Sequence, residues 1–226
     1  MNQHPKLEVC AANLRSVRAA RQGGAVRVEL CSALDRDGLT PALQSIHATM
    51  REQIDVNILI RPREGDFVYS ADEVQRMDQS IRRVAAAGVH GVVFGALTEA
   101  GDVDVKTCSR LMQTAQRYGL STTFHRAFDV CRSPKEALEV IIRLGFDRLL
   151  TSGQAPTAEA GIPLLRELVE QADGRIIVMP GAGVSPQNVA RILRETGATE
   201  IHGSLRLSDT TSLRLVKATC RAIEEV

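Results

Sequence analysis

The chain has 226 residues, and its 28 Lys and Arg against 27 Asp and Glu give a formal net charge of +1. This balance, with only 3% aromatic residues and no Trp, offers neither a basic surface nor a base-stacking platform, so we expect no nucleic-acid partner. The five cysteines include no Cys-x-x-Cys pair, which indicates reduced thiols instead of a disulfide framework.

The N-terminal segment and the hydropathy of the chain predict a cytoplasmic protein. Residues 1–6 lack the apolar run of a signal peptide, and no later stretch is long and apolar enough to cross a bilayer, so no membrane partner is expected. No linker interrupts the sequence. We therefore expect residues 1–226 to form a single domain.

Short β-rich runs alternate with segments of helical periodicity from one end of the chain to the other. The expected strands cover residues 6–10, 26–31, 56–61, 91–95, 121–125, 148–151, 175–179 and 200–202. Between them, apolar residues such as Val74, Met77 and Ile81 recur at three- and four-residue steps, which predicts amphipathic helices that cover a sheet.

The helix boundaries carry sequence signals. Ser70 with Glu73 and Ser133 with Glu136 are typical of capping boxes. Prolines are expected at the first helical position and glycines at the left-handed C-terminal cap. The prolines are Pro41, Pro134 and Pro186, and the glycines are Gly23, Gly88, Gly119, Gly145 and Gly197.

Eight β-α units with short connections predict parallel strands in an α/β fold. We favour a closed (β/α)8 TIM barrel, and an open doubly wound sheet is the alternative. In such a barrel the ligand site lies at the carboxyl ends of the strands, so polar residues at those ends are the candidates for function.

The first two strands each place a carboxylate and a thiol on one face. Side chains alternate along a strand, so Glu8 points with Cys10 and Glu29 points with Cys31. Thiolates on neighbouring strands suit a soft metal such as Cu(I), which makes Cys10 and Cys31 candidate metal ligands. The alternative is that both cysteines are buried apolar fillers.

The same inward face carries further charge. The carboxylates of Glu8 and Glu29 are candidates for acid-base chemistry, and the guanidinium of Arg27 is a candidate for anion binding. Structural Glu–Arg pairing inside the barrel would also explain all three residues. Arg61 and Arg63, after the third strand, are candidate anion ligands, and a solvated loop is the alternative.

The segment after the fifth strand contains His125, Arg126 and Asp129. A histidine there could act as acid, base or metal ligand, and Asp129 could orient it by a hydrogen bond; a satisfied structural histidine is equally compatible with the sequence. We therefore include His125 and Asp129 among the catalytic candidates and Arg126 among the anion ligands.

Glycine-rich loops follow the last two strands, where this barrel commonly binds phosphate. Glycine lets backbone N–H groups approach an anion, although tight turns would also need it. The candidate anion-binding residues here are Gly181, Gly183, Gly203 and Ser204, together with Ser152 after the sixth strand.

Several motifs in fixed order resemble the CutC copper-homeostasis family. They include residues 7–10, 28–31, 60–63, 65–67, 123–129, 150–153 and 201–204. The resemblance implies a (β/α)8 barrel, a cytoplasmic homo-oligomer (dimer or tetramer), no organic cofactor and, in some members, Cu(I) bound by cysteines that match Cys10 and Cys31.

The chain departs from the family pattern in loops. Val26 replaces a common aspartate, Asp37 and Glu64 replace glycines, and Ala182 interrupts a glycine run. The connection over residues 205–212 is shorter than the long polar loop usual there. These departures weaken the phosphate-site hypothesis most.

Two functions are expected from the sequence. The first is copper homeostasis, with Cu(I) held by Cys10 and Cys31 for cytosolic buffering or trafficking. The alternative is a TIM-barrel enzyme acting on a small anionic substrate, phosphorylated or not, by Glu and His acid-base chemistry.

Overall fold

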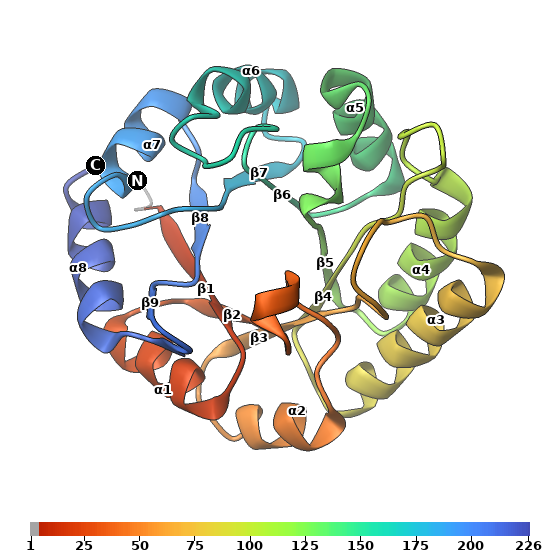
Figure 1. Cartoon of the computed structure of the whole chain (residues 1–226), viewed down its shortest axis with the longest axis horizontal. Coiled ribbons are helices and arrows are strands. Elements are labelled where there is room, and N and C mark those ends of the chain that lie inside the picture. The colour runs from red at the N-terminus through yellow and green to blue at the C-terminus, as the bar shows by residue number, and fades with distance from the viewer. Residues whose placement is uncertain (1–4) are drawn as a thin grey trace.

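The computed structural model describes residues 5–226 as a ring of parallel strands enclosed by a ring of helices (Figure 1). Residues 1–4, part of the segment in which we expect no signal peptide, lie outside the described residues. The strands of the ring are β1 (Lys6–Ala11), β2 (Arg27–Leu30), β3 (Asp55–Leu59), β4 (Gly91–Phe94), β5 (Ser121–Phe124), β6 (Arg148–Thr151), β7 (Ile177–Pro180) and β8 (Glu200–Gly203).

The strands follow one another around the sheet in the order β7-β6-β5-β4-β3-β2-β1-β8. All of their pairings are parallel, and β1 pairs with both β2 and β8, so the first and last strands meet. No ladder joins β7 to β8 in the described sheet, and the barrel is therefore nearly closed. The predicted (β/α)8 fold is confirmed.

The helices lie outside the strands and alternate with them. They are α1 (Leu14–Gly23), α2 (Leu43–Thr49), α3 (Ala71–Ala86), α4 (Val105–Arg117), α5 (Pro134–Leu144), α6 (Ile162–Ala172), α7 (Val189–Thr196) and α8 (Leu213–Glu224), with short 3-10 turns η1 (Leu34–Arg36) and η2 (Arg126–Val130). In α3 the stripe Val74, Met77 and Ile81 is buried as predicted. Between the ring of helices and the strands lies the main apolar core.

Some helix boundaries differ from the prediction. Ser70 and Glu73 form the expected capping box, but Ser133 makes no capping hydrogen bond through its side chain. Its backbone ψ of 95° differs from the 164° of Ser70, so the chain enters the two helices at different angles. Pro134 starts α5, as predicted.

Two prolines and one glycine have other positions than we predicted. Pro41 and Pro186 precede helices that begin at Leu43 and Val189, so neither is the first helical residue. The left-handed cap of α1 is Gly24, with φ 98°. Gly23 lies inside α1, where a Cβ would come within 2.3 Å of Val216, so that glycine permits close packing against α8.

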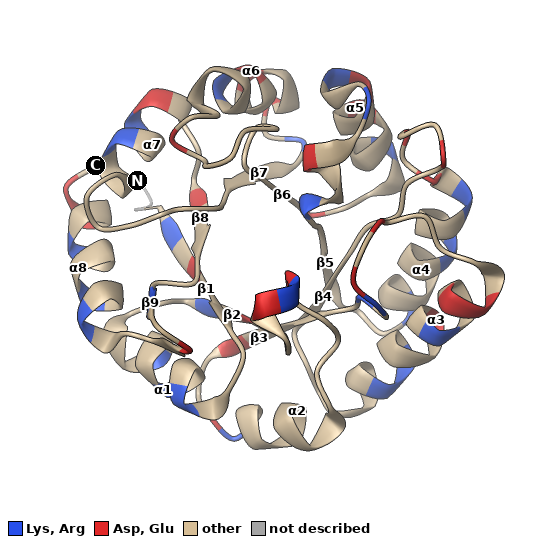
Figure 2. Cartoon of the chain, in the orientation of Figure 1, with Lys and Arg blue, Asp and Glu red and all other residues tan. Residues whose placement is uncertain are grey.

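The connection after β8 is a short ordered hairpin. Strands β9 (Arg206–Leu207) and β10 (Thr210–Thr211) pair antiparallel next to α1. Charged residues of both signs are spread over the outer helices and loops in Figure 2, without a block of one sign. Among the described helices, none is both long and apolar enough to span a bilayer.

Candidate functional site

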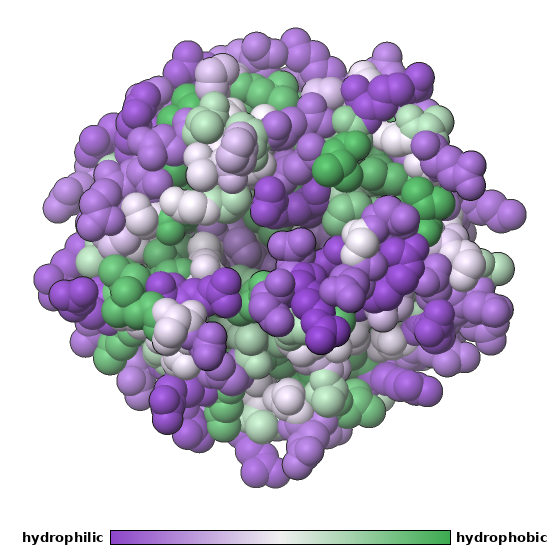
Figure 3. Space-filling view, in the orientation of Figure 1, coloured by the Kyte–Doolittle hydropathy of each residue, from purple (hydrophilic) through white to green (hydrophobic). Residues whose placement is uncertain are grey.

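A cavity of about 500 Å³ opens at the carboxyl ends of the strands. The space-filling view shows this face hollowed at its centre, with hydrophilic residues around the opening (Figure 3). The predicted site residues that line the cavity are Cys10, Glu29, Cys31, Arg61, His125, Arg126, Asp129, Gly183, Gly203 and Ser204. Side chains from many strands therefore converge on one space, as the fold predicts.

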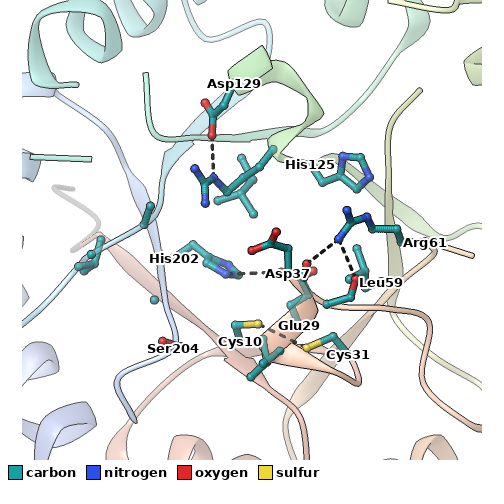
Figure 4. A pocket seen from close by; sticks show the side chains of 18 of the residues that line it. Cys10, Glu29, Cys31, Asp37, Leu59, Arg61, His125, Asp129, His202 and Ser204 are labelled. Atoms are coloured by element: carbon teal, nitrogen blue, oxygen red, sulfur yellow. Dashed lines mark hydrogen bonds and ion pairs between the residues drawn. The ribbon is translucent and has the colours of Figure 1, made fainter. Parts of the chain in front are cut away.

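The two thiols lie next to each other. Cys10 is on β1, Cys31 directly follows β2, and their sulfur atoms are 3.6 Å apart (Figure 4). The hydrogen bond with Cys31, together with burial, raises the pKa of Cys10 well above its ordinary value. In the absence of a metal, Cys10 is therefore a protonated thiol at neutral pH.

His202 on β8 completes this cluster, and our sequence analysis did not select it. Ligand atoms of Cys10, Glu29 and His202 all lie within 4.8 Å of one another. Nδ1 of His202 lies 2.8 Å from Oε1 of Glu8, and its Nε2 lies 3.5 Å from Oε2 of Glu29. The strand register explains this contact, because Glu8 pairs directly with His202 across β1 and β8.

The three groups around His202 have shifted pKa values. Burial would raise the pKa of Glu8, but the hydrogen bond from His202 and the charge of Arg27 lower it to about 2. Burial raises the pKa of Glu29 to about 7. For His202, burial acts downward, but hydrogen bonds to Cys10 and Glu8 and the nearby carboxylates raise the pKa well above the ordinary value.

A buried ion network lies deeper in the barrel. Arg27 pairs with Glu8 and with Glu200, and Arg148 donates from Nε to Glu200 at 2.8 Å. Neither Glu8 nor Arg27 lines the cavity. Structural Glu–Arg pairing, one of the two alternatives for these residues, is thus present, and a catalytic or anion-binding role for them stays a prediction.

Arg61 follows β3 and lies at the cavity wall. Its Nη1 donates to the carbonyl oxygens of Arg36, Asp37 and Gly38, each at 3.1 Å, and its Nη2 donates to the carbonyl of Gly65 at 3.0 Å. The guanidinium therefore connects the loop after β2 with the loop that follows Arg61 itself.

His125 is fixed by contacts that the sequence did not reveal. Its Nδ1 accepts a hydrogen bond from the N–H of Ala127 at 3.2 Å, and its ring packs against Phe67 with centroids 4.9 Å apart. Burial, reinforced by the charge of Arg61, lowers the pKa of His125 to about 3. The ring is neutral at physiological pH.

The expected orienting hydrogen bond from His125 to Asp129 is wrong. Asp129 instead accepts from Thr151, from backbone N–H groups of the loop after β6, and from Nε of Arg126 at 2.7 Å. Its carboxylate anchors that loop, since the chain turns back at η2 and leaves Asp129 facing β6. Arg126 is half-exposed at the mouth.

Other predicted residues lie away from the cavity. Arg63 pairs with Asp66 at 2.8 Å and with Glu73 at 2.7 Å. Ser152 donates its hydroxyl to the carbonyl of Ala155, and Gly181 packs closely against Leu150. None of the three lines the cavity, whereas Gly183, Gly203 and Ser204 do.

The comparisons with known proteins decide the family. The model of the CutC family matches residues 5–207. The chain belongs to the CutC family. A protein named family protein CutC from Parabacteroides distasonis is 51% identical over 202 residues, which cover 88% of this chain and 82% of the relative. The human copper homeostasis protein cutC homolog is 45% identical over 209 residues, covering 92% and 76%.

Solved structures agree with this assignment. A crystal structure of a CutC protein from Streptococcus agalactiae superposes with a TM-score of 0.84 at 33% identity and covers 88% of this chain and 98% of its own. Phosphoribosylanthranilate isomerase from Pyrococcus furiosus, at 12% identity, has a TM-score of 0.66 and shares the fold alone.

Two departures from the CutC pattern now have a structural account. Asp37 and Ala182 have φ values of 60° and 82°, in the left-handed region that favours glycine. Both residues line the cavity, so this chain keeps glycine-like turns at the mouth but places side chains there. Gly203 and Ser204, which precede the short connection after β8, also line the cavity.

Proposed function

We propose that this CutC chain binds Cu(I) at Cys10 and Cys31, with His202 as a third ligand, and that it serves cytosolic copper buffering or trafficking as a homo-oligomer. The observation that supports the proposal is the 3.6 Å contact between the two sulfur atoms at the wall of the cavity. Thiolate and imidazole are ligands that suit copper.

The spacing of the donors favours three-coordinate over linear binding. With metal–sulfur bonds of ~2.3 Å, the value known for zinc, two sulfurs 3.6 Å apart span an angle of about 100° at the metal. A linear site would need the sulfurs about 1 Å further apart at the same bond length. A third donor is therefore expected, and the imidazole of His202 is beside Cys10.

Anaerobic titration of the reduced protein with Cu(I) against a competing chelator tests this proposal. We expect one Cu(I) per chain in the wild type and none in the Cys10→Ala/Cys31→Ala variant. The matched control is Cys220→Ala, a half-buried cysteine on α8 far from the cavity lining. Unchanged stoichiometry in the double variant would contradict the proposal.

A second candidate function is an enzyme that acts on a small anionic substrate. The cavity favours it, because about 500 Å³ is far more than one ion needs and lies in the range of small-molecule sites. Arg126 at the mouth supplies positive charge, and Glu29 and His125 supply polar groups inside. In the Cys10→Ala/Cys31→Ala variant, binding of inorganic phosphate that Arg126→Gln weakens would support this function independently of copper.

A further inference from the structure

Arg61 is a buried guanidinium without a counter-ion. The residue is 4% exposed, and across residues 5–226 no Asp or Glu oxygen lies within 4.0 Å of its nitrogens. Every other arginine described above as lining or underlying the cavity has a carboxylate partner: Arg27 has Glu8 and Arg126 has Asp129. A buried charge is stable only when it is paired or well hydrogen-bonded.

The hydrogen bonds of Arg61 satisfy only part of the group. Its Nη1 and Nη2 donate to four backbone carbonyls, but its Nε is buried and has no acceptor in the described part of the chain. Carbonyl oxygens carry dipoles and not a full negative charge. Arg61 lines the cavity and therefore keeps a positive charge at its wall, together with one N–H that has no acceptor.

His125 presents a second unused donor. Because Nδ1 accepts from the N–H of Ala127, the single proton of the neutral ring is on Nε2. That Nε2 is buried, and it has no acceptor within residues 5–226. A buried donor without a partner lowers the stability of the fold by about 1–3 kcal/mol, so we expect a ligand to supply an acceptor for this N–H.

The two donors belong to one contact group. The ring of Phe67 lies 4.9 Å from the ring of His125 and 5.0 Å from the guanidinium carbon of Arg61, and Figure 4 shows the two side chains next to each other. A Cβ at Gly95 would come within 2.9 Å of Nδ1 of His125, so the ring position also depends on a glycine at the end of β4.

We propose that Arg61 and His125 form an oxyanion-binding subsite that receives the carboxylate or phosphate of a small ligand in the cavity. Arg61 supplies the charge, and His125 supplies a fixed neutral N–H donor instead of acting as an acid, a base or a metal ligand. This inference rests on the second candidate function, the binding of a small anion. Beyond that function, it names the two residues that bind the charged group of the ligand.

Nitrogen-15 NMR of the histidine rings, with the metal-free full-length protein at pH 7, tests the subsite. Inorganic phosphate and acetate are added separately, with chloride at equal ionic strength as the blank. We expect His125 to be the Nε2–H tautomer and its N–H signal to move with one or both oxyanions but not with chloride. A larger response to phosphate or to acetate distinguishes the two classes of ligand.

Two substitutions isolate the donor. His125→Phe keeps an aromatic ring against Phe67 but removes the N–H, and we expect oxyanion affinity to fall about 10- to 100-fold, the effect of one hydrogen bond to a charged group. His125→Gln keeps an N–H donor and should recover most of that loss. The control is Arg63→Gln, which lies in the loop after β3 with Arg61 but does not line the cavity, and it should leave the oxyanion affinity unchanged.

The outcomes separate this inference from the proposed function. Equal oxyanion affinity in wild type and His125→Phe, with both proteins folded, would overturn the subsite while small-anion binding stands. A His125 ring protonated at Nδ1 would also overturn it. If neither phosphate nor acetate binds the wild type, both the second candidate function and the subsite fail.

Discussion

The protonation of a residue in this barrel depends on which neighbours the strands bring to it. His125 and His202 are both buried, yet burial and Arg61 lower the pKa of His125 to about 3, whereas Cys10, Glu8 and Glu29 raise the pKa of His202. Two imidazoles that line one cavity therefore have pKa values shifted in opposite directions. Their chemical roles differ for that reason.

The neutral state of His125 predicts a pH-dependent stability. Its folded-state pKa of about 3 is below the ordinary 6.5, so between these values the unfolded chain binds a proton that the folded chain does not. The stability that His125 contributes is therefore present above pH 6.5 and is lost as the pH falls toward 3. Each pKa unit corresponds to ~1.4 kcal/mol, so a loss of a few kcal/mol is expected.

Urea unfolding of the wild type and His125→Phe at pH 7, 6, 5 and 4 checks this expectation. The free energy of unfolding of the wild type should fall relative to that of the variant as the pH decreases. His47→Phe, at an exposed position on α2, is the control and should follow the wild type. Parallel curves for wild type and His125→Phe would show that His125 has the same pKa in the folded and the unfolded chain, and would contradict the prediction.

At the scale of single elements, two serines allow the contribution of helix capping to the free energy of unfolding to be measured. Ser70 accepts from the N–H of Glu73, and Glu73 accepts from the N–H of Ser70, whereas Ser133 makes no capping bond through its side chain. We predict that Ser70→Ala lowers the free energy of unfolding by about 1 kcal/mol. Ser133→Ala should change it by less than half as much.

Thermal and urea unfolding of both variants measures this difference. The two serines share the same motif spacing, so each is the control of the other. An equal loss for both would mean that Ser133 caps α5 in solution.

The loops at the mouth depend on Arg61. Its guanidinium donates to carbonyls in the loop after β2 and to Gly65 in the loop after β3. We predict that Arg61→Met raises amide hydrogen exchange in both loops, because both lose hydrogen bonds. Arg63→Met, whose contacts lie within residues 64–73, should raise exchange in that loop alone. Faster exchange in only one loop of Arg61→Met would contradict the connection.

The alternation of strands in the sequence predicted much of this site. Strand parity placed Glu8 with Cys10 and Glu29 with Cys31, and the structure brings the two thiols into contact. It did not predict His202, although Glu200 and His202 are also two residues apart on one face of a strand. The partner of His202 is Glu8 on β1, and the pairing of the first strand with the last depends on closure of the whole barrel.

The loops were harder to predict for a related reason. The neutral state of His125 and the role of Asp129 depend on which backbone groups a turn presents, and η2 turns Asp129 toward β6 and away from His125. A sequence gives the spacing of His125 and Asp129 but not the direction of the chain between them.

At the scale of the whole molecule, charged side chains replace part of the missing hydrogen-bond ladder. No ladder joins β7 to β8, yet Glu200 on β8 accepts from Arg148 on β6 and from Arg27 on β2. The network therefore runs across the interior of the barrel, from one side of the β7–β8 gap to the other. Backbone pairing and buried ion pairs close the ring together.

This arrangement predicts that Glu200→Gln destabilises the barrel at the β7–β8 gap. The substitution keeps the size of the side chain but removes the charge shared by Arg27 and Arg148, and loss of one partner from a buried ion network costs about 3–5 kcal/mol. Hydrogen exchange should rise most in β7 and β8, because no ladder joins them. The control is Glu195→Gln, a half-exposed partner of Arg191, which should cost less than about 1 kcal/mol. If Glu200→Gln costs no more than this control, backbone pairing alone closes the barrel.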